Sequence, residues 1–331
     1  MALLTPIKDK MTGGLVLSKK QMALAVSGAF TILTVGLVAI FGAEPEFPIN
    51  RGKNVGMKID DAVDWTTREG AWLFDFISDS VTYTLLYIEN FFVWMPWPAF
   101  MIGVGVLAWK VVGVRVGIFA VIALLLLASM GLWHSAMETM ALVVVSVSLS
   151  IGFAVPVGIF AAKNDRVDMV LRPVLDGMQT MPSFVYLVPA IMFLGIGNVP
   201  AIFATIVYAV PPAIRLTNLG IRQVSPEIVE AALSFGTTSR QLLFKVQIPM
   251  AVPTIMAGIN QTIMMALAMV VIASLVGAGG LGEDVMRALS RQEPGKALLA
   301  GTGIVIMAII IDRITQAAAK SRQEALNGPG V

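Results

Sequence analysis

Long apolar stretches separated by short charged segments dominate the chain. A helix needs about 20 apolar residues to span a bilayer, because hydrocarbon offers the backbone no hydrogen-bond partners. The first uncharged stretch, residues 21–43, lacks a clean small-residue cleavage site, so we expect a retained anchor helix. Further crossings are expected at residues 98–112, 116–133, 139–162, 176–215 (two crossings, broken at 195–200), 246–282 and 297–311. The pattern predicts an all-α integral membrane protein with about eight transmembrane helices.

A different pattern separates the first stretch from the others. Charges and turn-forming residues crowd positions 44–64. Apolar residues then recur every three or four positions from Trp72 to Phe92, with Asp75 and Asp79 on the opposite face. This spacing is typical of an amphipathic helix, which either packs on the helix bundle or lies in the membrane interface.

Composition excludes several classes of protein. Hydrophobic residues make up 57% of the 331 residues and charged residues only 13%, against about 25% charged in a typical soluble domain. With no cysteine and one histidine, the chain has no disulfide, zinc-thiolate site, thiol nucleophile or multi-histidine metal site. The net charge of +2 gives no reason to expect a nucleic-acid partner.

The distribution of positive charge predicts an orientation. If the N-terminus lies inside, most of the 23 Lys and Arg residues fall on inside segments, and every segment obeys the alternation. Cytoplasmic loops carry this excess in membrane proteins. An even number of helices also returns the C-terminus to the cytoplasm. We therefore expect a multi-pass protein of the bacterial cytoplasmic (inner) membrane with both termini cytoplasmic.

One polar excursion, residues 215–247, interrupts the apolar spans on the predicted cytoplasmic side. Ser225-Pro226-Glu227 is typical of a helix start, with a serine cap and a proline in the first helical position. Gly236 then suits a left-handed C-cap. A second short helix is expected from Thr238 and should stop at Pro249. Two short helices joined at a glycine corner predict a rigid knob outside the membrane.

The same segment resembles the EAA motif of bacterial ABC importer permeases. That pattern is Glu-Ala-Ala, three residues, Gly, nine residues, an aliphatic, any residue, an aliphatic and Pro. It is matched throughout by Glu230, Ala231, Ala232, Gly236, Val246, Ile248 and Pro249. The resemblance implies that these residues, with Arg240, form a coupling helix that docks in a groove of an ATP-binding subunit.

A narrower resemblance covers about residues 137–316. The strings 176–189, 195–200, 244–247 and 253–262 resemble permeases of glycine betaine/proline betaine ABC importers of the ProW/OpuA type. This implies a MetI-like ABC permease core over residues 98–331, with the coupling loop at 215–250. Residues 1–97, with the anchor and the amphipathic helix, resemble the family only loosely.

The resemblance also implies partners and a solute class. Two copies of the chain would form the pathway for quaternary-amine osmolytes, and two ATPase subunits would bind ATP and Mg. A periplasmic or tethered binding protein would deliver the solute from outside, and membrane lipids would surround the bundle. The chain itself has no G-x-x-x-x-G-K-[ST] segment to cradle phosphates, so we expect no cofactor and no enzymatic activity in this subunit.

Betaine chemistry points to candidate pathway residues. Aromatic faces attract quaternary ammonium by roughly 0.5–2 kcal/mol each, weakly enough to allow release. The candidates are Met181, Phe184, Tyr186, Tyr208, Asn260 and Gln261. Core packing is an alternative role for each of them. Pro182, Pro189, Pro211 and Pro212 should break helices at membrane depth, as part of a moving gate or as static kinks.

Three further readings compete with or limit this one. An ion-coupled secondary transporter would need ionisable residues within its spans, and residues 177–214 and 246–282 carry none. An ABC permease for another small solute, such as choline, a sulfonium osmolyte, trimethylamine oxide or an amino acid, fits the same motifs. Residues 277–282 match G-x-G-x-x-G but follow an apolar span, so we expect a turn at the outer side rather than a dinucleotide site.

Two helix boundaries are also expected from single charged or polar residues. His134 is expected at a turn, and Asp312-Arg313 at the inner end of the last helix.

Overall fold

The computed structural model describes residues 19–41 and 52–327, and every regular element in these ranges is helical. The α-helices are α1 (Lys19–Phe41), α2 (Gly52–Glu69), α3 (Ala71–Trp94), α4 (Trp97–Val111), α5 (Val114–Ser129), α6 (Trp133–Lys163), α7 (Asp165–Thr180), α8 (Leu187–Leu194), α9 (Asn198–Arg222), α10 (Pro226–Ser234), α11 (Ser239–Gln241), α12 (Ile248–Ala273), α13 (Leu281–Ser290) and α14 (Pro294–Asn327). Two short 3-10 helices, η1 (Ser183–Tyr186) and η3 (Ser274–Val276), and one π-helix, η2 (Leu242–Gln247), connect them.

The chain divides into two units, Met1–Ala62 and Val63–Val331. In the first, α1 begins within two residues of the expected anchor, whose last residues lie outside the described ranges. The sequence pattern did not single out α2, which occupies part of the charged segment. Its apolar side chains recur at Val55, Ile59 and Val63, which is the spacing of one helix face.

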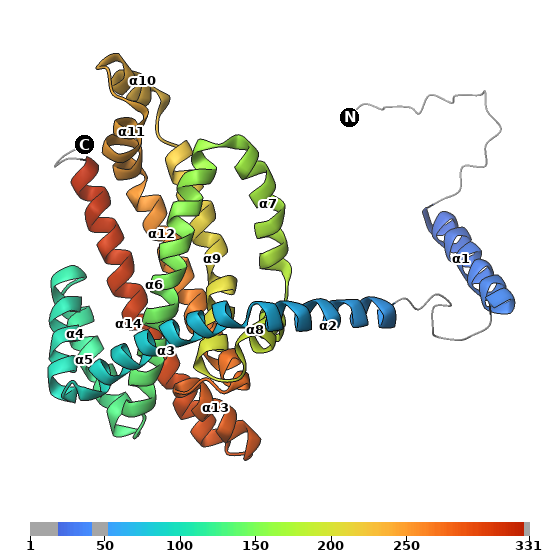
Figure 1. Cartoon of the computed structure of the whole chain (residues 1–331), viewed down its shortest axis with the longest axis horizontal. Helices are drawn as coiled ribbons and strands as arrows, with labels where there is room; N and C mark the ends of the chain where they lie inside the picture. The colour runs from blue at the N-terminus through green and yellow to red at the C-terminus, as the bar shows by residue number, and fades with distance from the viewer. Residues whose placement is uncertain (1–18, 42–51, 328–331) are drawn as a thin grey trace, which may run out of the picture. The chain divides into compact units, whose positions relative to one another are not determined.

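The centre of the second unit is formed by α6, α9 and α12, which lie side by side (Figure 1). Glycines let these helices approach closely. A Cβ on Gly158 of α6 would lie 2.9 Å from the Ile214 carbonyl of α9, and one on Gly258 of α12 would lie 3.1 Å from the Ala213 Cα. Small residues at such contacts are typical of membrane helix packing, where lipid provides no hydrophobic drive for association.

The expected amphipathic helix is confirmed as α3. Leu85 is buried against the central helices, with Val81, Ile88 and Phe92 packed beside it. At Pro96 the chain bends by 98° into α4. The C-terminal half of α3 therefore packs on the bundle, whereas Trp72 near its start is exposed.

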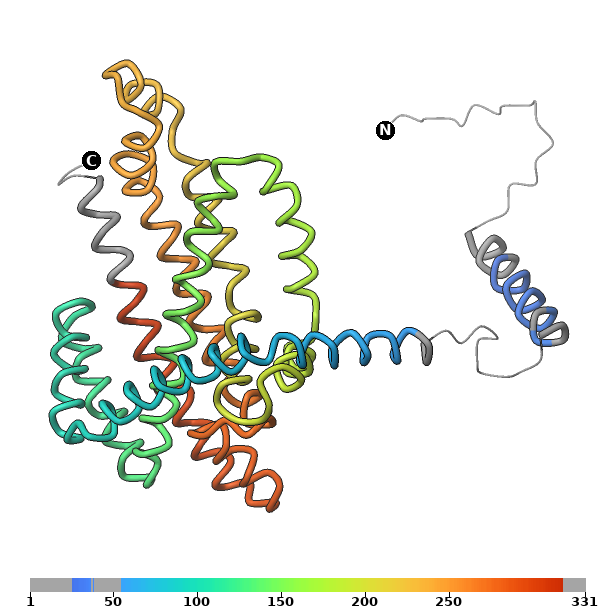
Figure 2. The backbone as a smooth tube through the Cα atoms, viewed as in Figure 1, coloured from blue at the N-terminus to red at the C-terminus, as the bar shows by residue number. Residues whose placement is uncertain are grey.

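Two of the expected helix breaks are present. The chain bends by 110° at Pro182, between α7 and the η1–α8 segment (Figure 2), and α8 and α9 are separated within residues 195–200. The other expected breaks were wrong: Pro189 lies in the first turn of α8, and Pro211 and Pro212 lie inside α9. This stretch is buried between neighbours, and the Thr262 hydroxyl of α12 donates to the adjacent Ala209 carbonyl at 2.9 Å. Such tertiary support is what membrane helices use to tolerate proline.

Two further boundaries also differ from expectation. Asp312 and Arg313 do not end the last helix, because α14 continues to Asn327. The turn expected at His134 lies just before it, at residues 130–132 with Gly131 in a left-handed conformation, and His134 is in the first turn of α6.

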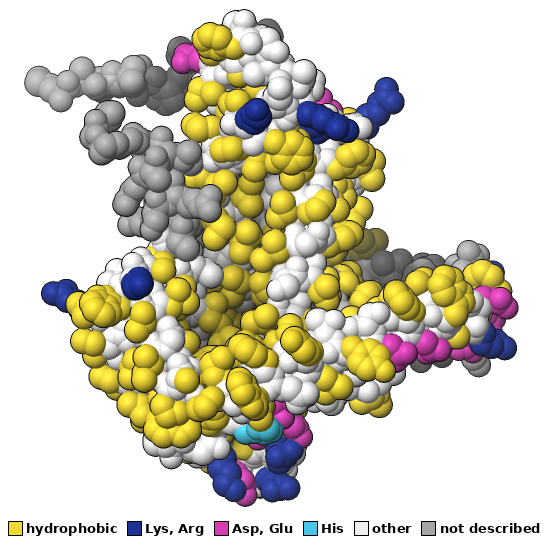
Figure 3. Space-filling model, turned by 60° about the vertical axis from the view of Figure 1, so that its left-hand side comes forward, with side chains coloured by type: hydrophobic (Ala, Val, Ile, Leu, Met, Phe, Trp, Pro, Cys, Tyr) yellow, Lys and Arg dark blue, Asp and Glu magenta, His cyan; other side chains and the backbone are white. Residues whose placement is uncertain are grey.

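The helices fit a membrane in length and surface. Four of the described helical segments are apolar and long enough to span a bilayer, or up to six segments if each bent pair counts as one span, and two shorter apolar helices lie at Val26–Gly36 and Val114–Ser129. The expected total of about eight is therefore approximate. Figure 3 shows hydrophobic side chains over the side of the bundle, with Lys and Arg gathered toward the α10 end and charges of both signs at the other end.

Candidate functional site

The knob expected between the apolar spans is present as α10 and the turn after it. α10 projects from one end of the bundle (Figure 1) and buries none of its residues. Glu230, Ala231 and Ala232 lie along it, with Glu230 and Ala231 exposed. At its end the ring of Phe235 is 90% exposed. An isolated amphipathic helix with an exposed phenylalanine has an apolar surface free for a partner.

Local sequence explains the shape of this knob. Pro226 occupies the first turn of α10, as expected, although the Ser225 side chain makes no capping hydrogen bond. Gly236 has φ of 76°, and a Cβ built on it would meet nothing within 4 Å. Thr238 and Gln241 then form a reciprocal capping box that starts α11, which also carries the exposed Arg240. Each end is thus stabilised by backbone and capping interactions within the knob itself.

Pro249 does not stop the second helix, which corrects the expectation. The π-helix η2 directly precedes α12, in which Pro249 is the second residue, and the chain runs without interruption as one apolar segment, Ser239–Val276. A proline ring collides with the carbonyl four residues earlier and lacks an N–H. The wider π turn shifts hydrogen bonding to the fifth residue, so the ring of Pro249 is accommodated. The knob is therefore joined to a long span by continuous helix.

A polar network that the sequence analysis missed fixes the base of the knob. The Asp168 carboxylate of α7 is 6% exposed and accepts hydrogen bonds from Arg172 at 2.5 Å and from Asn218 of α9 at 2.7 Å. Arg222, the last residue of α9, donates to the Ala161 carbonyl of α6 at 2.8 Å and pairs with Asp165 at 2.6 Å.

This network joins three helices just before the chain leaves for α10. Arg215 and Asp176 form a further α9–α7 ion pair beside it, and the surrounding cavity has a volume of about 470 Å³. The sequence signal was the alternation of Asp and Arg at four-residue spacing in 165–176, which places them on one helix face.

The candidate pathway residues do not form one group. Met181 and Phe184 are exposed at the bend between α7 and α8. Tyr186 is buried, its hydroxyl donates to the Met178 carbonyl across the bend, and its ring centroid lies 6.2 Å from that of Tyr208 on α9. Its hydroxyl therefore holds the bend in place.

The two polar candidates lie elsewhere, on α12. The Asn260 amide donates to Asp312 at 3.0 Å, and its oxygen accepts from Thr315 at 2.7 Å, both on α14. Gln261 is exposed. Both the nitrogen and the oxygen of the Asn260 side-chain amide thus help to join α12 and α14. Of the two polar candidates, Gln261 is the one whose side chain is exposed.

The glycine-rich segment after α12 is a turn, as expected. Gly277 and Gly280 have φ of 88° and 87°. The Gly279 N–H donates to the Asn198 side chain at 3.1 Å, and the Leu281 N–H donates to the Thr139 hydroxyl at 2.8 Å. The turn is therefore tied to α9 and α6 at the end of the bundle opposite the knob (Figure 1).

Long apolar helices around a glycine-packed core, with an exposed knob beside the start of one span, are typical of a multi-pass membrane protein. Residues 154–322 match the family described as binding-protein-dependent transport system inner membrane component, just over half of the chain. The chain belongs to this family of ABC importer permeases.

Individual relatives agree with this assignment. The chain is 45% identical over 269 residues to the glycine betaine/proline betaine transport system permease protein ProW of Escherichia coli, covering 81% of this chain and 76% of the relative. It is also 45% identical over 258 residues to the glycine betaine transport system permease protein OpuAB of Bacillus subtilis, covering 78% and 92%. A solved structure of the MetNI methionine ABC transporter shares the fold, with a TM-score of 0.54, 21% identity, and coverage of 58% of this chain and 96% of that one.

Proposed function

We propose that the chain is the membrane subunit of an ATP-driven importer for quaternary-amine osmolytes such as glycine betaine or proline betaine. ATP and Mg bind to a separate ATPase subunit, and this chain moves the solute. The observation that carries the proposal is the knob: α10 buries no residue, and after the turn at Gly236 the chain runs from α11 through η2 and α12 as one 38-residue apolar segment. A push on the knob is transmitted along this helix because helices are stiff along their axes and α12 packs on α9 and α6.

Glu230, Ala231, Ala232, Gly236, Arg240 and Pro249 are the proposed coupling residues. The first five lie in or beside the exposed knob, and Pro249 marks the change from π turn to span. In this arrangement the apolar tip at Phe235 enters a groove of the ATPase, and Glu230 and Arg240 contact its rim. Aromatic anchors in a pocket with a polar surround are typical of tight interfaces.

The knob end of the bundle is proposed to face the cytoplasm, with both termini on that side. Lys163 and Arg166 lie at the α6–α7 turn, and Arg240 and Lys245 lie in α11 and η2, all at this end of the bundle, in agreement with the positive-inside rule. The turn at Gly277–Gly282 would then face the side from which a binding protein delivers solute. Two copies of the chain and two ATPases complete the proposed importer.

The solute class rests on the names of the relatives and on the chemistry of the bend. Glycine betaine carries a permanent cation, so an aromatic face attracts it without trapping it. Phe184 and Met181 are the exposed apolar candidates at the α7–α8 bend, with Tyr186 and Tyr208 behind them and Gln261 on α12. We propose that a second copy covers the exposed Phe184 face and encloses the pathway.

The test is ATP-dependent uptake of labelled glycine betaine. Cells that lack their own betaine importers would express this chain with its neighbouring ATPase and binding-protein genes. Uptake that unlabelled betaine competes away supports the proposal down to the solute class. If the ATPase co-purifies but no betaine enters, the permease assignment stands and the solute is another onium compound or an amino acid.

Coupling is tested in the same cells with Gly236→Trp. An added Cβ at Gly236 would meet nothing within 4 Å, so the bulky ring should leave the bundle assembled and block docking, with uptake lost. Gly236→Asn is the matched control, because Asn tolerates the left-handed conformation and stays small. Normal uptake by the Trp variant would remove the coupling assignment.

A further inference from the structure

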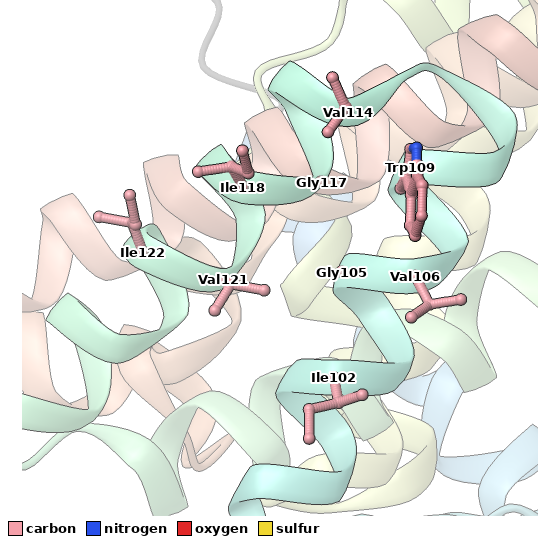
Figure 4. Close-up of a pocket in the computed structure, with 9 residues that line it drawn as sticks. All are labelled: Ile102, Gly105, Val106, Trp109, Val114, Gly117, Ile118, Val121 and Ile122. Carbon is pink, nitrogen blue, oxygen red and sulfur yellow. The ribbon is translucent and has the colours of Figure 1, made fainter.

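A groove between α4 and α5 stands apart from the coupling and pathway residues. It has a volume of about 320 Å³ and is lined only by glycine and apolar side chains. These are Ile102, Gly105, Val106, Trp109, Ile118 and Ile122, with Val114, Gly117 and Val121 (Figure 4). The side chains at its rim are exposed, so the groove opens outward rather than into the core.

Two glycines create this groove by bringing the helices together. A Cβ on Gly105 would lie 2.5 Å from Val121, and one on Gly117 would lie 2.8 Å from the Gly105 carbonyl. The close approach leaves the larger side chains on either side as walls. In Figure 4, Trp109 and Val114 lie at the end near the α4–α5 turn, and Ile102 and Ile122 lie toward the other end. From Ile102 to Trp109 the groove is about 10 Å long, which fits within one leaflet.

Two positively charged residues beside one end of the groove indicate what kind of molecule it binds. Lys110 and Arg115 flank the turn at residues 112–113; both are exposed, and neither forms an ion pair within the described part of the chain. The two cations directly follow Trp109 and Val114, the lining residues at the turn end of the groove. An apolar slot with an indole at one end and two cations beside it matches a phospholipid, with an acyl chain in the slot and a phosphate at the cations.

The length of the hairpin places these cations at an unusual depth. α4 and α5 have 15 and 16 residues, or about 22–24 Å, less than the roughly 30 Å of a hydrocarbon core. Figure 1 shows that their turn ends well short of the ends of α6 and α14 on the α10 side. A positive charge at the depth of this turn costs free energy unless an anion lies beside it. The phosphate of a lipid drawn inward would be such an anion.

We propose that the α4–α5 groove is a binding site for one anionic phospholipid, held by its acyl chain in the groove and by its phosphate at Lys110 and Arg115. The site is independent of the proposed solute and of the ATPase. It requires only that this hairpin lies in a bilayer.

The absence of cysteine from the chain allows a direct test with one label. Phe119→Cys places a bimane fluorophore on an exposed position beside the groove. The full-length labelled chain is reconstituted in nanodiscs of phosphatidylglycerol and phosphatidylcholine. Only one of the two lipids carries brominated acyl chains in each sample, at equal mole fraction.

Brominated phosphatidylglycerol should bind in preference to brominated phosphatidylcholine by roughly twenty-five-fold and should be the stronger quencher, since each of the two cations contributes about a factor of five. Lys110→Gln with Arg115→Gln should abolish the preference. Val106→Trp, which fills the groove with the charges intact, should reduce quenching by both lipids.

Lys163→Gln with Arg166→Gln is the matched control. It removes two charges from the α6–α7 turn that also lack ion pairs among the residues described, and the preference should persist. Equal quenching by both lipids in the parent protein would overturn the proposal. So would an equal loss in the control, or weak quenching by both lipids, which would mean that a protein segment covers the groove.

Discussion

The two turns that flank α12 contain glycines for opposite reasons. Before α12, Gly236 takes a left-handed conformation with open space around it. After α12, a Cβ on Gly280 would collide with the Thr139 hydroxyl, and one on Gly282 with the Val270 carbonyl. Gly236 is needed only for the backbone conformation of the exposed knob, whereas Gly280 and Gly282 also allow neighbouring helices to approach closely.

The two ends of α12 therefore differ in role: the turn after it contributes to the packing of the bundle, and the knob before it is available to bind a partner. The turn after α12 is bonded to α6 and α9 through Thr139 and Asn198, so a change there alters the packing of the bundle. The knob before α12 rests on η2 and buries none of α10. A change in the knob should alter what it binds while the bundle keeps its stability. Four substitutions test this contrast.

Gly282→Ala should have the largest effect on stability. Its Cβ meets backbone atoms of Val270 that cannot rotate away, so we expect a loss of about 3 kcal/mol or more. Thermal unfolding of the purified protein in detergent measures it. Gly295→Ala in α14 is the control, since nothing lies within 4 Å there. A similar unfolding temperature for the two variants would contradict the close packing of this turn.

Thr139→Val should come next. The valine keeps the shape of threonine but leaves the buried Leu281 N–H without its acceptor, at a cost of about 1–3 kcal/mol. Thr205→Val is the matched control, because the Thr205 hydroxyl donates only to Ala201 of its own helix. The contrast fails if both variants unfold at the same temperature.

Asn218→Ala tests the base of the knob. It removes a donor from the buried Asp168 carboxylate and an acceptor from Arg222, and we expect a loss of about 1–2 kcal/mol because other partners remain. Uptake should fall as well, since the base joins α6, α7 and α9. Ser234→Ala on exposed α10 gives the comparison, with an unchanged unfolding temperature. Unchanged unfolding and uptake in Asn218→Ala would show that the network does not stiffen the base.

Glu230→Lys should have the smallest effect on stability, within about 0.5 kcal/mol, because the side chain is exposed. We nevertheless expect weaker ATPase co-purification and reduced uptake, since reversal of charge at a docking surface opposes its partner. Lys245→Gln changes charge outside the proposed contact set and serves as the control. Undiminished co-purification and uptake in Glu230→Lys would move the docking surface away from Glu230.

Local patterns predicted the knob better than the bends. Pro226, Gly236 and the Thr238–Gln241 box act through their own neighbours, so their positions could be inferred from spacing. The stop at Pro249 was wrong because a π turn relieves the proline clash, and no simple residue pattern announces that turn. Pro211 and Pro212 were misplaced as breaks because packing on α12 supports the helix around them.

The candidate site residues lie in separate places. The motif residues from Glu230 to Arg240 lie in or beside the knob, whereas the pathway candidates are divided among the α7–α8 bend, α9 and α12. Asn260 was chosen for its polarity, but its amide bonds to α14. The Asp168 network was missed because it joins residues about fifty positions apart.

The sequence by itself determined that this protein lies in a membrane and to which class of membrane protein it belongs. Apolar length, charge distribution and the Glu-Ala-Ala to Pro249 spacing depend on composition and local order. Only the tertiary structure decided where helices continue or bend, which glycines admit a neighbour, and that α4 and α5 enclose one apolar groove. These outcomes depend on contacts between distant segments, whose energies no local pattern contains.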